Sequence, residues 1–224
     1  MRILAIDTAL TACSVALIDT QPEAVLARQT VPMERGHAEA LLPMIDQAAG
    51  GAAGLSRLDR IAVTTGPGSF TGIRVGLSAA RALSLATGKP LIGVTTLIAL
   101  VAPVLATGDG RAVAAAVDAR HGRVFFQVFA PSGLGLVPAR VLTAAEAARM
   151  AGEGPIRITG SGANAVIAAS RVPHEIVAGS VVPDPVWLAR LGAAAPVPER
   201  VPRPVYLRPA DVTRSTSPIE VRRA

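Results

Sequence analysis

The order in which strand-like and helix-like segments follow one another constrains the fold of this 224-residue chain more than any other feature. In the first half, short apolar runs predict strands at residues 2–10, 12–19, 24–31, 60–66 and 91–94. Apolar periodicity predicts helices at 36–51 and 70–87. From residue 111 the order nearly recurs, with elements at 112–119, 123–130, 134–142, from 143 (helix), 156–160 and from 161 (helix). Although no sequence repeat is visible, the pattern predicts two related β-β-β-α-β-α lobes.

A duplicated plan of this kind is the architecture of the actin, sugar-kinase and heat-shock-ATPase (ASKHA) superfamily. We therefore predict an α/β protein with an ASKHA-like fold. The expected domains are an N-terminal lobe at residues 1–106, a smaller C-terminal lobe at 107–183, and a closing helix with a Pro- and Arg-rich tail at 184–224. A fold of this class hosts many functions, so it does not by itself assign one.

Composition limits the setting in which the chain works. Half of the residues are hydrophobic and only 3% are aromatic, which favours close-packed aliphatic layers. The net charge of +6 permits contact with nucleic acid without requiring it. Cys13 has no second cysteine to pair with, and Asp7 interrupts the first apolar run, where a signal peptide would be apolar. The apolar run at 91–106 is shorter than a membrane span and predicts a buried strand followed by a core helix. We expect a cytoplasmic protein.

The glycine-rich stretch GPGSFTG at residues 66–72 resembles a phosphate-binding loop. It lacks both the Lys-Ser/Thr pair of a P-loop and the third glycine of a dinucleotide fingerprint, so it is not a standard phosphate loop. In the helix that follows, Gly72, Gly76, Ala80 and Ser84 recur every four residues. Glycine costs a helix ~1 kcal/mol relative to alanine, so this ridge predicts the close approach of another backbone. That backbone belongs either to the chain's own sheet or to a second subunit.

Few residues are candidates for chemistry. Asp7 and Thr8, after the first strand, either contact a metal-bound nucleotide or only cap the hairpin turn. Gly160 and Gly162 either let an adenosine approach or only form a turn. No metal site is predicted, because none of the histidines has a second histidine three or four residues away; they are His37, His121 and His174.

Four segments together resemble one family, the TsaB (YeaZ) proteins: ILAIDT, GHAEALLPMI, GPGSFTGIRVGLSAARAL and PVYLRPADV. The resemblance runs from Ile3 to Val212. It implies a non-catalytic partner subunit of the bacterial complex that forms N6-threonylcarbamoyladenosine in tRNA, beside the anticodon. It implies no cofactor.

The resemblance also implies partners. The chain would pair with a TsaD-type catalytic subunit through helices at residues 36–48 and 70–87, and a TsaE-type ATPase would join the pair. Without its partner the chain would form a homodimer. It would meet tRNA through the complex and would not contact a membrane. In TsaD the strand after the glycine helix leads into two metal-binding histidines, where this chain has Thr96 and Leu100. The implied interface residues are His37, Leu41, Leu42, Ile45, Phe70, Gly72, Arg74, Gly76 and Ala80. With this interface, Gly76→Leu should weaken pairing and leave the fold intact.

Two alternatives remain at this point. One is a stand-alone ATP-dependent transferase, with Asp7 on the metal, the Gly160 turn on adenine and Asp118 as a further acidic group. The other is a general nucleic-acid-binding module, which the scarcity of aromatic residues disfavours. The basic tail predicts weak, salt-sensitive contact with tRNA through Arg200, Arg203, Arg208, Arg214, Arg222 and Arg223.

Overall fold

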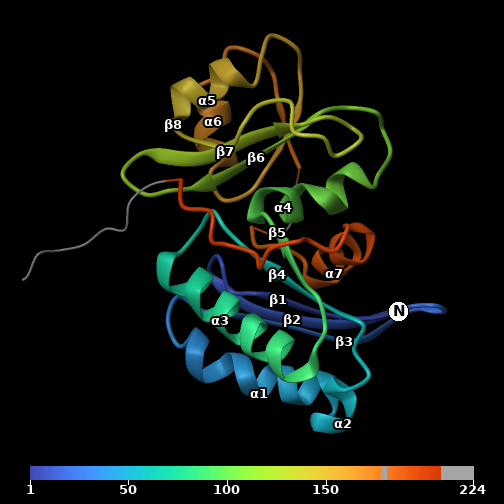
Figure 1. Ribbon diagram of the computed structural model, residues 1–224. Coiled ribbons are helices and arrows are strands. Elements are labelled where there is room, and N and C mark those ends of the chain that lie inside the picture. Colours follow the sequence, from blue (N-terminus) through green and yellow to red (C-terminus); the bar gives the residue numbers. More distant parts are fainter. Residues whose placement is uncertain (178–180, 208–224) are drawn as a thin grey trace, which may run out of the picture.

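The computed structural model describes residues 1–177 and 181–207 and shows two lobes, each built on its own five-stranded mixed sheet (Figure 1). The first sheet contains β1 (Arg2–Asp7), β2 (Ala12–Thr20), β3 (Glu23–Pro32), β4 (Arg60–Thr64) and β5 (Leu91–Val94). The second contains β6 (Val113–Asp118), β7 (Arg123–Phe129), β8 (Arg140–Thr143), β9 (Arg157–Thr159) and β10 (Glu175–Ile176).

The two sheets have the same topology. The first has the order β3-β2-β1-β4-β5 and the second β10-β9-β6-β7-β8. If the second-lobe strands are counted from β6, the second order is the first one reversed. In each lobe the first strand pairs antiparallel with the second and parallel with the fourth. The predicted duplicated plan and the ASKHA-like fold class are thus confirmed.

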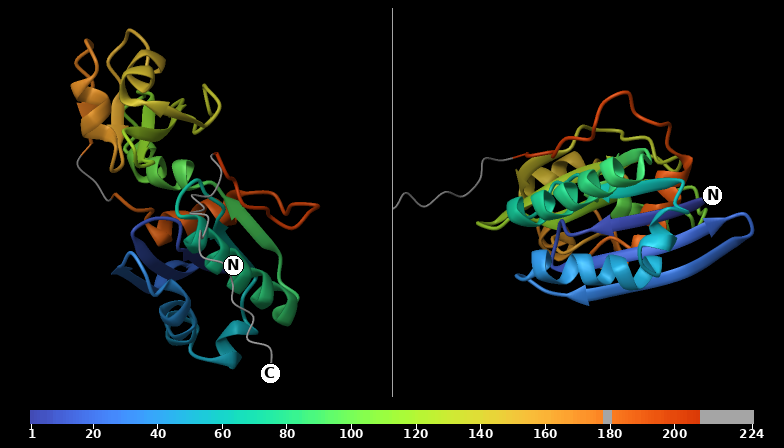
Figure 2. Two further views of the ribbon diagram at one scale, coloured as in Figure 1. Left: turned by 90° about the vertical axis from the view of Figure 1, so that its left-hand side faces the viewer. Right: turned by 60° about the horizontal axis from the view of Figure 1, so that its bottom comes forward.

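The helices lie on both faces of these sheets. They are α1 (His37–Ala49), α2 (Ala52–Leu55), α3 (Phe70–Thr87), α4 (Thr96–Leu105), α5 (Ala144–Met150), α6 (Ala163–Ala168) and α7 (Pro185–Ala194). Helices α1 and α3 cover the outer face of the first sheet, and α4 and α7 lie between the lobes (Figures 1 and 2). Helices α5 and α6 cover the outer face of the second sheet.

Strand β1 shows how the sequence sets these layers. Its side chains alternate, so Leu4 and Ile6 join the core under α1 and α3, while Ile3 and Ala5 join the core under α7. All four are fully buried. A strand that is buried on both faces has a continuous apolar sequence, as residues 3–6 do.

The ends of the elements agree with the sequence in most places. The side chain of Ser69 caps the N-terminus of α3, and Gly88 ends the helix in a left-handed conformation, as predicted. The apolar run at 91–106 forms β5 and the buried helix α4, also as predicted. The strand expected near 134–142 is shorter and later, at Arg140–Thr143, because the preceding loop makes only an isolated bridge from Gly135 to Phe129.

One arginine of the first lobe binds the C-terminal end of helix α7. The Arg60 guanidinium donates hydrogen bonds to the carbonyl oxygens of Gly192, Ala193 and Ala195, at 3.2, 3.2 and 2.6 Å. These carbonyls belong to the C-terminal end of α7, where a positive charge also interacts favourably with the helix dipole.

No helix in residues 1–177 and 181–207 is long and apolar enough to cross a membrane. The expected domain boundaries at 106 and 183 stay predictions.

Candidate functional site

The glycine-rich stretch packs closely against the turn between β1 and β2. The Ser69 amide donates to the Ala9 carbonyl at 2.7 Å, and the Thr8 hydroxyl donates to the Gly72 carbonyl at 2.7 Å. A Cβ atom at Gly68 would overlap the Ala9 carbonyl, and one at Gly72 would overlap the Thr8 carbonyl. These glycines therefore let the turn approach the start of α3 closely.

The small-residue ridge of α3 faces the chain's own sheet. Gly72, Gly76 and Ala80 are buried, and a Cβ at Gly76 would overlap the Thr8 hydroxyl. The prediction that this ridge meets a second subunit was wrong, because the backbone that approaches it is that of the β1–β2 turn. Gly76→Leu should consequently disturb folding.

Asp7 is buried beside the same turn. One carboxylate oxygen accepts hydrogen bonds from the Ala9 amide at 3.1 Å and the Thr64 hydroxyl at 2.6 Å, while the other has no partner among the described residues. Burial raises the pKa of Asp7 to about 6, and the two hydrogen bonds oppose this rise. The Asp7 side chain thus caps the hairpin turn and is not exposed in a cleft.

The glycines proposed to approach adenosine also pack within the protein. A Cβ atom at Gly160 would overlap the Ala116 carbonyl of β6. A Cβ atom at Gly162 would come too close to the same carbonyl and would overlap the Val124 side chain. Asp7 and Thr8 lie under the glycine-rich stretch of the first lobe, whereas these glycines lie against β6 of the second. The structure gives each pair a packing reason and does not join them in one open site.

The positions that correspond to the TsaD metal ligands do not fit a metal. Thr96 and Leu100 lie on buried α4, and Leu100 has no donor atom. Of the histidines, His37 and His174 are buried and His121 is exposed in the β6–β7 turn. Among the described residues, no group of three His, Cys, Asp or Glu side chains is arranged to hold a metal ion.

The predicted interface residues divide into buried and exposed sets. Six of them are buried in the single chain and cannot meet a partner directly: His37, Leu41, Ile45, Gly72, Gly76 and Ala80. Leu42 on α1 is 58% exposed. The sequence reasoning missed Leu85 on the adjacent helix α3, which is 88% exposed although it is apolar.

Phe70 and Arg74 contact a segment that the sequence reasoning also missed. Residues 201–207, which we call the strap, follow α7 and run along the first lobe beside β5 and α3 (Figure 1). The Tyr206 ring lies 4.7 Å from the Phe70 ring between centroids, and the Arg74 guanidinium donates to the Tyr206 hydroxyl at 3.2 Å. The strap also lies against the start of the glycine-rich stretch. The Val205 amide donates to the Thr65 carbonyl at 2.8 Å, and a Cβ at Gly66 would overlap the Val205 carbonyl.

The strap thus stabilises the start of α3 from outside. The remaining tail arginines, Arg208, Arg214, Arg222 and Arg223, lie outside the described residues.

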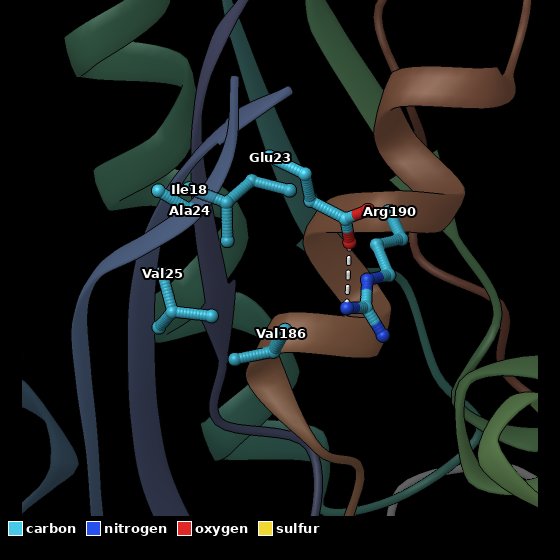
Figure 3. Close-up of a pocket in the computed structure, with 6 residues that line it drawn as sticks. All are labelled: Ile18, Glu23, Ala24, Val25, Val186 and Arg190. Atoms are coloured by element: carbon cyan, nitrogen blue, oxygen red, sulfur yellow. Dashed lines mark hydrogen bonds and ion pairs between the residues drawn. The ribbon is translucent and has the colours of Figure 1, made fainter. Parts of the chain in front are cut away.

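A pocket of about 310 Å³ lies on the other side of the first sheet, between the β2–β3 hairpin and α7 (Figure 3). Ile18, Val25 and Val186 provide its apolar wall, and the Glu23–Arg190 ion pair of 2.7 Å crosses its rim. None of the predicted nucleotide or interface residues lines it.

These observations define a class: a two-lobed ASKHA-like α/β protein in which the β1–β2 turn is covered and the positions of the TsaD metal ligands carry Thr and Leu. Comparison with known proteins gives the family. The model of the family described as TsaD, tRNA N6-adenosine threonylcarbamoyltransferase, matches residues 25–157, more than half of the chain.

Two curated relatives carry the name tRNA threonylcarbamoyladenosine biosynthesis protein TsaB. The chain is 39% identical over 127 residues to the one from Escherichia coli K12, and 36% identical over 127 residues to the one from Haemophilus influenzae. Each alignment covers 56% of this chain, and 54% and 52% of the respective relative.

A crystal structure from Pseudomonas aeruginosa, of an uncharacterized protein with similarity to peptidase YEAZ, superposes with a TM-score of 0.76 at 28% identity. It covers 92% of this chain and 99% of that one. The chain belongs to the TsaD-like family of the matching model and, within it, to the TsaB (YeaZ) proteins. The matched segment spans about half the length of the two curated relatives.

Proposed function

We propose that this chain is a non-catalytic subunit in the formation of N6-threonylcarbamoyladenosine in tRNA, and that it pairs with a TsaD-type transferase. The names of the two curated relatives support the pathway. On this proposal, a TsaE-type ATPase joins the pair, tRNA meets the chain within the complex, and a homodimer forms when the partner is absent.

The observation that carries the pairing is the outer surface of α1 and α3. These neighbouring helices pack side by side on the first sheet (Figure 1). Leu42 on α1 and Leu85 on α3 are exposed to solvent. Single exposed leucines are ordinary, so the proposal rests on the two helices lying side by side with one strongly exposed leucine on each. We place the pairing surface on these exposed sides, while the buried residues of the original prediction support the helices from beneath.

The absence of catalysis rests on the side chains present. Thr96 and Leu100 cannot bind a metal as histidines do, and Asp7 points into the protein with two hydrogen bonds to its own lobe. The stand-alone transferase would need Asp7 to face a nucleotide. We therefore expect the purified chain neither to hydrolyse ATP nor to transfer threonylcarbamoyl on its own. Steady-state turnover that Asp7→Ala abolishes would favour that alternative.

The pairing is tested by Leu42→Asp and Leu85→Asp, separately and together. A charge at a covered apolar position should weaken association with the TsaD-type protein by about 30-fold or more, the factor of a hot-spot residue. Leu134→Asp is the matched control, because Leu134 is 70% exposed on the second lobe. Binding is measured by titration calorimetry. Equal affinity of all three variants and the wild type would place the interface elsewhere.

A further inference from the structure

A second surface, beside the proposed pairing surface, is formed by two segments that contain no acidic residue. No Asp or Glu occurs between Asp59 and Asp109, a stretch that contains all of α3, and none occurs in the strap. Three exposed arginines lie here, namely Arg74 and Arg81 on α3 and Arg203 on the strap. We call the surface that bears them the strap face.

The strap fixes these arginines relative to one another. Arg81 donates to the Pro202 carbonyl at 2.6 Å, and Arg74 donates to Tyr206 at 3.2 Å, so the strap follows α3 with Arg203 between the two contacts. Arg74 and Arg81 are about two helical turns apart, which separates them by ~10 Å along the axis. Three exposed arginines therefore come from two segments that lie against each other.

None of the three arginines forms an ion pair with a residue in 1–177 or 181–207, whereas Arg28, Arg111, Arg157 and Arg190 all do. Exposed guanidinium groups that form no ion pair with a described residue attract a polyanion.

An aromatic ring on the same surface favours RNA over an acidic protein. Tyr206 is the only tyrosine of the chain and is 39% exposed. Phe70 supports its ring from beneath, and the Arg74 guanidinium lies 3.8 Å from the Phe70 ring centroid. Unpaired bases stack on aromatic and guanidinium planes, while neighbouring arginines contact phosphates.

We propose that the strap face binds the phosphate backbone of a single-stranded or looped RNA segment through Arg81 and Arg203, with a base stacked on Tyr206. This inference rests on the proposed function, in which the complex handles tRNA, and it adds a direct RNA contact by this subunit. Arg74 positions Tyr206 and adds to the positive charge.

The test measures binding of a labelled RNA stem-loop to the full chain over a range of salt concentrations. For single strands, each phosphate contact contributes ~0.7 to the slope of log affinity against log salt concentration. Arg81→Gln and Arg203→Gln should each lower this slope by about 0.7. Arg35→Gln and Arg171→Gln, at exposed arginines elsewhere, should leave it unchanged.

Variants of Tyr206 test the stacked base. Tyr206→Phe keeps the ring and should keep the affinity, whereas Tyr206→Ala should lower it by ~5- to 150-fold, the effect of one lost base stack. An RNA duplex without a loop should be insensitive to both changes.

Three results would overturn the inference: no RNA binding, slopes that the strap-face and control variants change alike, or competition by polyglutamate as effective as by RNA. The last result would assign the face to an acidic protein. Partner affinity is measured on the same variants. If Arg203→Gln leaves the RNA slope unchanged while the chain still pairs with the TsaD-type protein, the inference fails and the proposed function stands. If RNA binds as expected but no pairing occurs, the proposed function fails.

Discussion

The two lobes end their first strands in the same way, with an aspartate that caps a hairpin turn. Asp7 accepts a hydrogen bond from the Ala9 amide at 3.1 Å, and Asp118 accepts one from the Arg120 amide at 2.8 Å. Their surroundings differ completely. Asp7 is fully buried with a raised pKa, whereas Asp118 is exposed.

The difference comes from what lies over each turn. In the first lobe the glycine-rich stretch, the long helix α3 and the strap all pack near the β1–β2 turn. In the second lobe the helix at the equivalent place, α6, has six residues, and the β6–β7 turn stays open with Arg120 and His121 at φ 62° and 52°. The same local turn is therefore a buried structural element in one lobe and an exposed surface feature in the other.

The largest expected effect is on the packing against the first turn. In Gly72→Ala the new Cβ would overlap the Thr8 carbonyl, and the backbone there cannot move without displacing the buried turn. We expect a loss of more than ~3 kcal/mol in unfolding free energy, above the common range for overpacking and despite the better helix propensity of alanine. Urea titration measures it. Gly154→Ala, where a Cβ meets open space, is the control. A stable Gly72→Ala variant would contradict the close packing.

The next effect concerns the charge of Asp7. Its pKa is raised to about 6, so the folded chain binds a proton more readily than the unfolded chain. This aspartate therefore favours folding fully below about pH 4 and loses up to ~3 kcal/mol of that contribution as the pH rises past about 6. Asp7→Asn should remove this pH-dependent loss of stability. Relative to the wild type, the variant should therefore be more stable at neutral pH than at about pH 4.

The comparison between lobes supplies the control for this experiment. Asp118→Asn should change the free energy of unfolding by less than ~0.5 kcal/mol, as is usual for exposed sites. Unfolding free energies of both variants and the wild type are compared across the pH range, so that other acidic groups cancel in the differences. If both substitutions behave alike, the burial of Asp7 has no energetic consequence.

The smallest expected effect is at Arg60, which attaches α7 to the first lobe. Arg60→Ala removes charge-assisted hydrogen bonds to three carbonyl oxygens and should cost ~1.5–3 kcal/mol. Hydrogen exchange should show that Arg60→Ala speeds the opening of α7 relative to the wild type and leaves the opening of α6, in the second lobe, unchanged. Unchanged protection of α7 would mean that its apolar face, with Leu188 and Ala189, and its ion pairs to the β2–β3 hairpin hold it without Arg60.

The strands and helices were predictable because their signals are local. Alternation, caps at Ser69 and Gly88, and the repeated element order lead directly to the two-lobed fold. The site was less predictable. The spacing of Gly72, Gly76 and Ala80 indicated a close backbone approach, but a helix ridge carries no information about which backbone approaches.

Leu85 and Tyr206 show the same limit. From the sequence, an apolar residue such as Leu85 in an amphipathic helix is taken for a core residue, because the positions of the neighbouring elements are unknown. Nothing near Tyr206 in the sequence indicates that its ring contacts Phe70, which is far away in the chain.

By itself the sequence determined the fold class, the family and the absence of metal-binding side chains at the two positions of α4, because each depends on residue type and order along the chain. The tertiary structure alone decided which faces are covered: it buried Asp7 and the glycine ridge, left Leu42 and Leu85 exposed, and brought the strap onto α3. Burial depends on contacts between residues distant in sequence, and such contacts are set by how the layers pack.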